Sequence, residues 1–452
     1  MRRLLVANRG EIARRVIRSA RKLGIETVAI HSEADAGLAH VAEADFALEI
    51  GPAPARESYL DMDKVLAAAA QAGADAVHPG YGFLSENAEF AARVAAAGLT
   101  WVGPPPETIR AMGDKARARA LAQAAGVPVV PGSDVIGAGS DLGAEAARVG
   151  FPLLVKAAAG GGGIGMRRVD RPEQLEQVVA ATQSMAGKAF GDGSVFLERF
   201  VPKARHVEIQ VFGFGEAGAI HLYERDCSLQ RRFQKVIEES PAPLLPAQTR
   251  DRMAAAAVAL CRHTGYRGAG TVEFIVDAES FEFFFLEMNT RIQVEHPVTE
   301  MVTGLDLVEM QLRFARGDLV TMTQDQVATR GHAIECRLYA EMPEKNFLPS
   351  PGPLTRFRPP AETEGLRIDS GYREGDAVTP YYDPMIAKLI VHGRDRADAC
   401  DRALAALAGF EIEGLRSNRG FLMACLSNPE FRRGDIYTGF IDDQRAALLE
   451  PA

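Results

Sequence analysis

Two carboxylates and one amide near the middle of the chain could hold a hard metal ion. Glu273 lies in a strand-like run at residues 271–276. Glu287 lies at the end of the next run, 281–288, and Asn289 directly follows that run. Residues two apart on a strand project from the same face, so Glu287 and Asn289 should point together. Mg²⁺ prefers one or two carboxylates together with substrate phosphates. The segment therefore predicts a magnesium-type site, with two solvated strand carboxylates as the alternative.

The geometry of the hairpin decides whether these groups can meet. A regular four-residue turn at residues 277–280 would pair Glu273 with Phe284 and not with Glu287. We therefore expect a bulge or a strong twist if the three groups share a metal. The apolar run 283–286 also predicts that Glu287 is buried, where an unpaired carboxylate would be costly. That cost favours the metal site over the alternative.

Residues 291–297 read Arg-Ile-Gln-Val-Glu-His-Pro and follow these ligands directly. A lone arginine would be interpreted as a surface residue. Here guanidinium, amide and carboxylate groups alternate beside a metal candidate, which suits the orientation of a small oxyanion. Two other polar features are less specific by themselves: residues 224–235 are typical of a solvated charged loop, and His206 of a structural histidine.

A glycine cluster at residues 160–165 follows a buried strand predicted at 151–157. Residues without Cβ let the backbone approach an oxyanion and direct N–H groups at it. No Gly-Lys-Ser/Thr follows, so the cluster is not a Walker A loop, and a plain flexible hairpin is the alternative. Lys156 precedes the cluster and could meet a phosphate as a point charge.

The elements that must position these groups fall into three regions. Strand-like and helical runs alternate over the first hundred residues, which predicts a parallel sheet wrapped by helices. The prolines at 104–106 end this region. Residues 195–300 are rich in strand signals and indicate an antiparallel α+β domain. From about His332, strand-like runs mix with Pro- and Gly-rich turns.

Composition limits the class of protein. The 452 residues include 51 basic and 60 acidic side chains, for a net charge of −9, which does not favour nucleic acid as a partner. The first residues are too weakly apolar for a signal peptide, and no run reaches the ~18 apolar residues of a membrane span. The five cysteines form no C-x-x-C pair, so we expect free thiols and a cytoplasmic protein without a membrane partner.

Together these segments resemble the biotin carboxylase family of the ATP-grasp superfamily over nearly the whole chain. The shared segments are residues 7–13, 78–87, 112–115, the glycine cluster, 205–210, 224–235, 287–297, 335–337 and 381–385. Residues 287–297 are the most specific. The resemblance implies an α/β and α+β fold: an N-terminal parallel-sheet domain (pre-ATP-grasp, 1–111), an ATP-grasp domain (112–330) with a glycine-rich lid at about 130–203, and a C-terminal mixed α/β domain (331–445).

The resemblance also implies a reaction. Members of the family use ATP to convert bicarbonate into carboxyphosphate, releasing ADP, and then carboxylate biotin at a ring nitrogen. The nucleotide phosphates would meet Lys115 and Lys156, with Gly162 and Gly163 closing over them. The remaining nucleotide contacts implied are Glu198, Arg199, Phe200, Val201, His206, Gln230, Ile275 and Ile436. The metal set would be Glu273, Glu287 and Asn289, of which the two glutamates are also counted with the ATP site. It would hold two Mg²⁺ or Mn²⁺ ions that neutralise charge in phosphoryl transfer.

The implied catalytic set lies further along the chain. Lys235, Arg291 and the backbone of Val294 would bind bicarbonate, and Glu295 would be its general base. Arg337 would stabilise the biotin enolate, which suits a permanently charged guanidinium, and Tyr81 with Arg337 would bind biotin.

Two residues depart from the family's pattern. Ile164 stands where many relatives carry Arg or Lys, and Phe233 where many carry His. Both remove a phosphate donor, while neither belongs to the bicarbonate or metal set. We therefore expect activity to survive with altered ATP handling.

The resemblance further implies partners: a biotin carboxyl carrier, a carboxyltransferase and a second copy of the chain in a homodimer. The chain contains no Ala-Met-Lys-Met-type biotin attachment segment. The final acceptor of the carboxyl group, an acyl-CoA, pyruvate or urea, would be selected by the carboxyltransferase. Two other hypotheses stay open here: another ATP-grasp ligase, such as a carbamoyl-phosphate synthetase-like or carboxyaminoimidazole-type enzyme, and a non-catalytic nucleotide-binding subunit.

Overall fold

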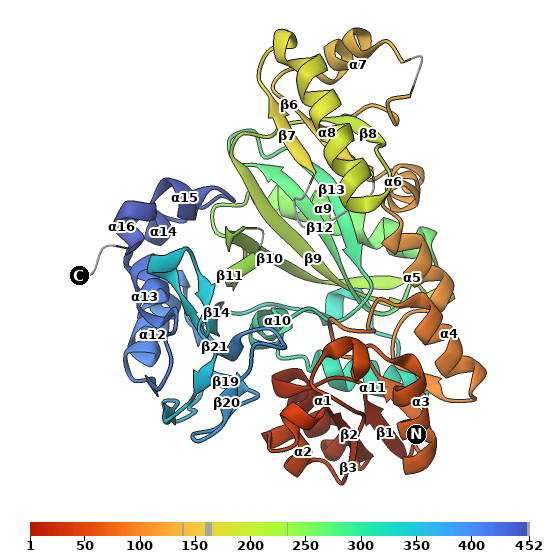
Figure 1. Ribbon diagram of the computed structural model, residues 1–452, viewed down its shortest axis with the longest axis vertical. Coiled ribbons are helices and arrows are strands. Elements are labelled where there is room, and N and C mark those ends of the chain that lie inside the picture. The colour runs from red at the N-terminus through yellow and green to blue at the C-terminus, as the bar shows by residue number, and fades with distance from the viewer. Residues whose placement is uncertain (138–139, 159–164, 233, 450–452) are drawn as a thin grey trace.

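The computed structural model describes residues 1–137, 140–158, 165–232 and 234–449. Its N-terminal unit is a five-stranded parallel sheet in the order β3-β2-β1-β4-β5 (Figure 1). The predicted parallel sheet is therefore confirmed. Its strands are β1 (Arg3–Val6), β2 (Glu26–His31), β3 (Phe46–Glu49), β4 (Ala76–His78) and β5 (Thr100–Trp101). Its longer helices are α1 (Gly10–Lys22), α3 (Met62–Ala72) and α4 (Ala88–Ala96), with the short α2 (Ala39–Glu43).

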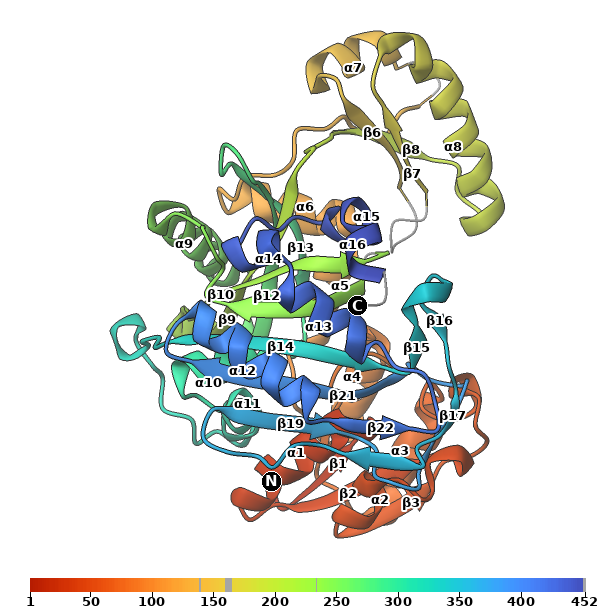
Figure 2. The same ribbon diagram turned by 90° about the vertical axis from the view of Figure 1, so that its left-hand side faces the viewer.

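Two helices, α5 (Pro106–Gly113) and α6 (Lys115–Ala124), lead from this sheet to a small three-stranded unit. The unit is an antiparallel sheet in the order β7-β6-β8, and it projects from the body of the molecule (Figure 2). Its elements are α7 (Leu142–Val149), β6 (Leu153–Ala157), β7 (Met166–Val169), α8 (Leu175–Phe190) and β8 (Val195–Arg199). It has its own apolar core, separate from the larger ones below it.

An eight-stranded sheet forms the centre of the molecule, in the order β13-β12-β9-β10-β11-β14-β21-β19. Its strands are β9 (Ala204–Phe214), β10 (Ala219–Arg231), β11 (Gln234–Ser240), β12 (Arg267–Asp277), β13 (Phe283–Asn289), β14 (His332–Tyr339), β19 (Leu366–Ser370) and β21 (Met385–Gly393). All neighbouring strands are antiparallel. Because β11 pairs with β14, one sheet continues across the division that we place at residue 330.

The helices around this sheet are short to medium in length. They are α9 (Ala247–His263), α10 (His296–Thr303), α11 (Leu307–Arg316), α12 (Arg396–Ala408), α13 (Arg419–Ser427), α14 (Pro429–Arg433), α15 (Phe440–Asp443) and α16 (Arg445–Leu449). Small two-stranded pairings complete the C-terminal third: β15 (Glu341–Met342) with β16 (Leu348–Pro349), β17 (Gly352–Pro353) with β20 (Ala377–Val378), and β18 (Arg356–Arg358) with β22 (Glu411–Glu413). Among the described residues, no helix is long and apolar enough to cross a membrane.

Strand β9 shows why the central sheet has one apolar and one polar face. Val207, Ile209 and Val211 belong to the apolar core that also contains residues of α9. His206, Glu208 and Gln210 alternate with them and therefore point to the opposite face. The polar face cannot be filled by apolar packing, so its buried charges need partners from neighbouring strands.

Close backbone packing at β9 gives a test of this sheet. A Cβ at Gly213 would lie 2.2 Å from the carbonyl oxygen of Tyr266, so the strand requires glycine there. We expect Gly213→Ala to lower the free energy of unfolding by about 1–3 kcal/mol, since backbone must move to relieve the clash. The matched control is Gly420→Ala on the exposed side of α13, where a Cβ meets nothing within 4 Å and should stabilise by up to about 1 kcal/mol. Thermal unfolding measures both, and equal melting temperatures for Gly213→Ala and the wild type would contradict the packing argument.

Candidate active site

A bulge in β13 brings the three predicted metal ligands to one face of the sheet. The turn is shifted toward the C-terminus, because the Asp277 N–H donates to the Glu282 carbonyl at 2.8 Å. The register then slips by one more residue, so that Glu273 lies opposite Glu287. The next pair on that face is Thr271 with Asn289. The expected bulge is therefore present, and it re-aims Glu287 and Asn289 toward Glu273, as bulges beside active sites do.

The expectation that Glu287 is buried was wrong. The residues that pack into the apolar core are Phe283, Phe285 and Met288, whereas Glu287 is exposed. The physical reason is the same bulge, which moves Glu287 from the apolar face of β13 to the polar face. A buried, unpaired carboxylate therefore does not exist here, and the case for a metal must come from geometry and charge.

Charge supports a cation at this place. The ammonium of Lys235 and the imidazole of His206 hold the pKa of Glu273 well below its usual range, although burial opposes this. Glu287 reaches solvent, yet partial loss of hydration and the nearby Glu273 carboxylate raise its pKa. Among the described residues Glu287 has no hydrogen-bond or ion-pair partner. A cation between the two carboxylates would remove their repulsion, and the side-chain oxygens present fit Mg²⁺ or Mn²⁺.

Lys235 is the electrostatic centre of the site. Its ammonium Nζ donates to Oε2 of Glu208 at 2.7 Å, to Oε1 of Glu273 at 2.9 Å and to Oε1 of Glu295 at 2.6 Å. Burial alone would lower the pKa of Lys235, but the surrounding acidic groups raise it well above its usual value. His206 adds a contact to the same cluster, since its Nε2 lies 2.9 Å from Oε2 of Glu273. His206, Glu208 and Glu273 could also surround a metal, but the Lys235 ammonium already neutralises Glu208 and Glu273.

Arg225 supports this cluster from the interior of the sheet. Its guanidinium is fully buried and donates to Glu208 at 2.5 Å and to Gln210 at 2.7 Å. Two hydroxyl oxygens, of Thr299 and Thr271, accept its remaining bonds at 3.0 and 3.1 Å. Sequence reasoning did not select Arg225 or Glu208 as site residues. The alternation of His206, Glu208 and Gln210 along one strand was the signal that could have identified Glu208.

The segment that follows the predicted metal ligands folds back over them. Arg291 donates to Asn289 at 3.1 Å, to Gln293 at 2.7 Å and to Glu86 of the N-terminal unit at 2.8 Å. Gln293 in turn donates to Glu273 at 3.0 Å. Arg291 is therefore held between the parallel sheet and the central sheet, close to two of the predicted metal ligands.

Glu295 lies between two cations. Lys235 contacts one of its oxygens, and NH2 of Arg337 donates to the other at 3.0 Å. Despite burial, these cations hold the pKa of Glu295 far below its usual range. The neighbouring Val294 carbonyl accepts a bond from Lys388 at 2.8 Å. Tyr81, predicted beside Arg337, donates its hydroxyl to Glu11, and Arg337 is among the charges that act on Tyr81.

The predicted nucleotide residues form a looser group. Lys156 and Glu198 pair at 2.7 Å across β6 and β8. The strand pair β9–β12 places Ile275 opposite His206. Lys115 begins α6 and acts electrostatically on Glu287. The other predicted positions lie on β8 and just after it (Arg199, Phe200, Val201), on β10 (Gln230) and in the C-terminal core (Ile436). Gly162, Gly163, Ile164 and Phe233 lie outside the described residues.

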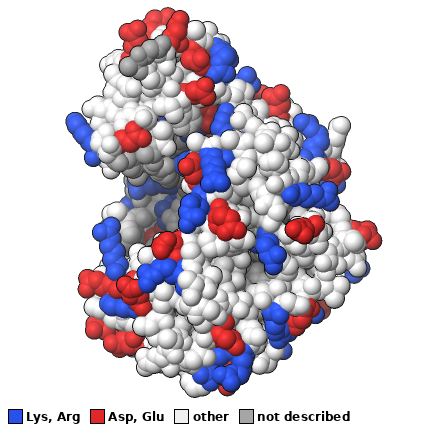
Figure 3. All heavy atoms as spheres, turned by 90° about the vertical axis from the view of Figure 1, so that its right-hand side faces the viewer, with Lys and Arg blue, Asp and Glu red and all other residues white. Residues whose placement is uncertain are grey.

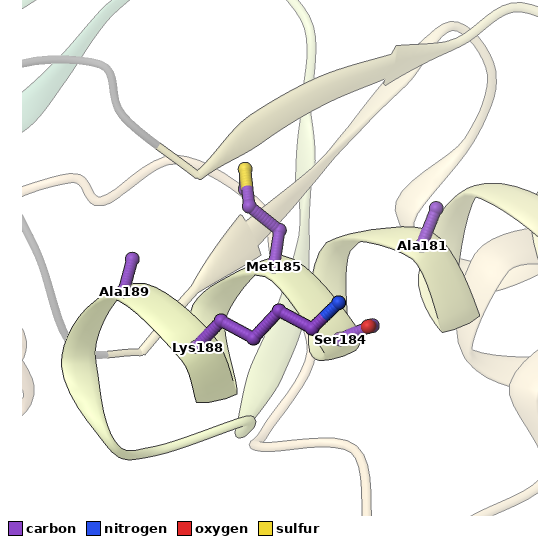
Figure 4. Close-up of a pocket in the computed structure, with 5 residues that line it drawn as sticks. All are labelled: Ala181, Ser184, Met185, Lys188 and Ala189. Carbon is purple, nitrogen blue, oxygen red and sulfur yellow. The ribbon is translucent and has the colours of Figure 1, made fainter.

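Figure 3 shows a hollow between the projecting three-stranded unit and the body of the molecule. Lys and Arg side chains gather at its edge (Figure 3). A separate hollow of about 560 Å³ lies on α8 and is lined by Ala181, Ser184, Met185, Lys188 and Ala189 (Figure 4). It contains none of the predicted site residues, so the chemistry is assigned to the polar face of the central sheet.

A carboxylate-rich antiparallel sheet beneath a small three-stranded unit, joined to an N-terminal parallel sheet, defines an ATP-grasp ligase. Three family sequence models match successive stretches of the chain: biotin carboxylase, N-terminal domain (1–109), carbamoyl-phosphate synthase L chain, ATP binding domain (114–322), and biotin carboxylase C-terminal domain (335–443). A protein of Nostoc sp. named biotin carboxylase is 48% identical, over 98% of this chain and 98% of its own length. The chain belongs to the biotin carboxylase family.

Solved structures and longer relatives agree with this membership. A biotin carboxylase complex from Campylobacter jejuni matches with a TM-score of 0.92 and 43% identity, over 98% of both chains. The biotin carboxylase domain dimer of a Hydrogenobacter thermophilus 2-oxoglutarate carboxylase, in complex with MgADP and bicarbonate, matches with a TM-score of 0.92 and 42% identity, over 100% of this chain and 99% of that one. The mitochondrial methylcrotonoyl-CoA carboxylase subunit alpha of Oryza sativa subsp. japonica is 51% identical over 99% of this chain. The chain spans only 61% of that protein's length.

The role of Arg225 can be tested without substrate. Arg225→Met leaves Glu208 buried beside a single cation, so we expect the free energy of unfolding to fall by about 3–5 kcal/mol. Adding Glu208→Gln removes the uncompensated charge and should recover part of that loss. Urea unfolding of the two variants and the wild type measures the difference. A single variant as stable as the wild type would show that Arg225 does not hold the cluster together.

Proposed function

We propose that this chain catalyses the ATP-dependent carboxylation of biotin by bicarbonate, with biotin presented on a carrier protein. The observation that carries the proposal is the continuous ionic network from Glu273 through Lys235 and Glu295 to Arg337. This network connects the proposed metal ligand Glu273 with the buried Arg337 on the polar face of the central sheet. The proposal also rests on the family membership of the chain.

The first step activates bicarbonate. An oxygen of bicarbonate attacks the γ-phosphorus of ATP, the bond to the β-phosphate oxygen breaks, and ADP leaves. Lys235 and Arg291 would bind the anion through their charges, with the Val294 N–H as a third donor. Mg²⁺ or Mn²⁺ at Glu273, Glu287 and Asn289 would supply charge neutralisation for the triphosphate. Lys115 and Lys156 would meet the phosphates, with Gly162 and Gly163 of the glycine cluster.

Glu295 would accept the proton of bicarbonate. Its low pKa keeps it ionised near neutral pH and therefore able to take a proton. An anion that draws Lys235 toward itself weakens the contact between Lys235 and Glu295, which raises the basicity of this carboxylate when the substrate is present. The bond between the carbon of carboxyphosphate and its phosphate oxygen then breaks, the released phosphate takes the N–H proton of the biotin ring, and the ring nitrogen bonds to the carbon of the carbon dioxide unit. Arg337 would stabilise the negative oxygen of the biotin enolate, with Tyr81 beside it.

The adenine would lie near β8 and β12. We assign its surroundings to Glu198, Arg199, Phe200, Val201, His206, Gln230, Ile275 and Ile436. The domain division at residues 1–111, 112–330 and 331–445 is proposed on the same basis. A carrier, a carboxyltransferase and a second copy of the chain are the proposed partners. We also propose a cytoplasmic location, since the five cysteines are free and buried.

A carbamoyl-phosphate synthetase-like activity is the second candidate, because the central family model carries that description. Both reactions pass through an acyl phosphate of bicarbonate. They differ in the acceptor, since one uses biotin and the other ammonia. Release of ADP therefore distinguishes them when each acceptor is supplied separately.

The proposal predicts ADP release that requires bicarbonate and increases with free biotin. ATP, bicarbonate and biotin are supplied in turn, and ADP and carboxybiotin are measured. EDTA should abolish turnover, and Mg²⁺ or Mn²⁺ should restore it. Stimulation by ammonia in place of biotin would favour the second candidate, and a lack of any bicarbonate-dependent ADP release would contradict both.

Glu295→Gln tests the base directly. The amide cannot accept the bicarbonate proton, so we expect kcat to fall by about 10²–10⁴-fold. The matched control is Glu173→Gln, an exposed glutamate on the projecting unit, which should retain wild-type kcat. Unchanged turnover in Glu295→Gln would remove the base role from this residue.

A further inference from the structure

Arg337 has a second buried acidic neighbour besides Glu295. Strands β11 and β14 are neighbours in the central sheet (Figure 1). Their pairing places Glu238 directly opposite Glu335, and Arg337 follows Glu335 by two residues. Directly opposite residues, and residues two apart, point to the same face, so the three side chains share the polar layer. NH2 of Arg337 forms an ion pair with Glu238 as well as with Glu295.

Both glutamates are completely buried. Glu238 and Glu335 are 0% exposed, and none of their four carboxylate oxygens accepts a well-directed hydrogen bond from any residue that the structure describes. Two charged carboxylates directly opposite each other in such a place would repel strongly, so the pair cannot carry two full charges. The Nε atom of Arg337 is also buried and has no hydrogen-bond partner within the described part of the chain. Two carboxylates therefore hold the NH2 atom of Arg337, whereas its Nε atom donates to none of the described residues.

We propose that Glu238 is a positioning residue for Arg337 in the biotin step, and that Glu335 is its permanently protonated neighbour. This inference deepens the proposed function and rests on it. When Glu295 takes the bicarbonate proton, it loses the charge that holds Arg337. Ionised Glu238 then remains as the anion that keeps the guanidinium in place beside the biotin oxygen. Protonated Glu238 cannot do this, because both acidic partners of Arg337 would then be neutral.

The charges around the pair come from several strands. The groups that act on Glu238 and Glu335 are Cys227 on β10, Lys235 on β11, Cys336, Arg337 and Tyr339 on β14, Lys388 on β21, and Glu295 before α10. Burial raises the pKa of Glu238 to about 7, with Glu295 adding to the effect and Arg337 and Lys235 opposing it. Burial raises the pKa of Glu335 well above its usual value, against Lys388. Glu238 therefore changes charge near neutral pH.

The direction of the pH effect follows. Above the pKa of about 7, Glu238 is ionised and holds Arg337. Below it, Glu238 is protonated and the biotin step slows. In the proposed site bicarbonate is bound by Lys235 and Arg291 and not by Arg337, so ADP release without biotin should lack this acid limb.

The experiment compares Glu238→Gln with its cross-strand neighbour, Glu335→Gln, in the full chain. Glutamine imitates the protonated acid, so Glu238→Gln should lose the acid limb and lower biotin-dependent kcat by up to about 100-fold, the effect of a misplaced catalytic group. Bicarbonate-dependent ADP release without biotin should stay at the wild-type rate, which also shows that the variant folds. Glu335→Gln should keep both the rate and the limb, because it replaces a neutral acid with a neutral amide. A purely structural role for Glu238 would not alter the pH profile of one step alone.

Infrared difference spectra recorded above and below neutral pH observe the protonated carboxyl group directly. We expect two carboxyl bands that titrate near pH 7 in the wild type, because the pKa of Glu341 is also raised to about 7, and only one of them in Glu238→Gln. The band that this variant loses is the titrating band of Glu238. If the wild type is active and Glu238→Gln has the same pH profile, the positioning role is contradicted and the proposed function is not. Loss of the acid limb in Glu335→Gln and not in Glu238→Gln would contradict the positioning role in the same way. A wild type without biotin-dependent turnover contradicts the proposed function, and the absence of the titrating band overturns the charge change of Glu238.

Discussion

Lys235 brings its ammonium group within 2.9 Å of Glu208, Glu273 and Glu295, and the polar face of the central sheet is organised around these contacts. Removing charges from water is costly, and the cost is offset only where partners and further hydrogen bonds surround them. Arg225 provides the second cation that Glu208 requires, and Arg337 provides it for Glu295. The cluster is therefore a mutually dependent set, in which each charge is tolerated because the others are present.

Strand register determines which groups can join this set. The bulge in β13 moves Glu287 and Asn289 to the face of Glu273. The pairing of β11 with β14 carries the same polar face into the C-terminal third, where Arg337 lies. One sheet thus connects the proposed phosphoryl-transfer chemistry with the proposed biotin site. Electrostatic coupling between the two proposed sites needs no domain movement, because Lys235 and Arg337 already contact the same carboxylate of Glu295.

The acidic groups of this layer differ in charge although they share one environment. Several cations hold the pKa values of Glu273 and Glu295 well below the usual range, whereas burial raises the pKa of Glu335 well above its usual value against the opposing charge of Lys388. Glu238 lies between these extremes. Burial favours the neutral acid at every position, and the number of adjacent cations decides where that preference is reversed. The layer can therefore hold acids and bases side by side.

The sequence by itself determined the parallel N-terminal sheet, the strand-rich centre and the resemblance to biotin carboxylases, because alternating patterns and contiguous motifs are local properties. It also indicated that Glu273 and Glu287 could meet only through an irregular hairpin. Only the tertiary structure decided that Glu287 is exposed and that Arg225 and Glu208 support the site. It also decided that Glu238 faces Glu335 and that one sheet crosses the predicted boundary at residue 330. These features depend on register between strands far apart in the chain, and a shift of one residue would have sent each side chain to the opposite face.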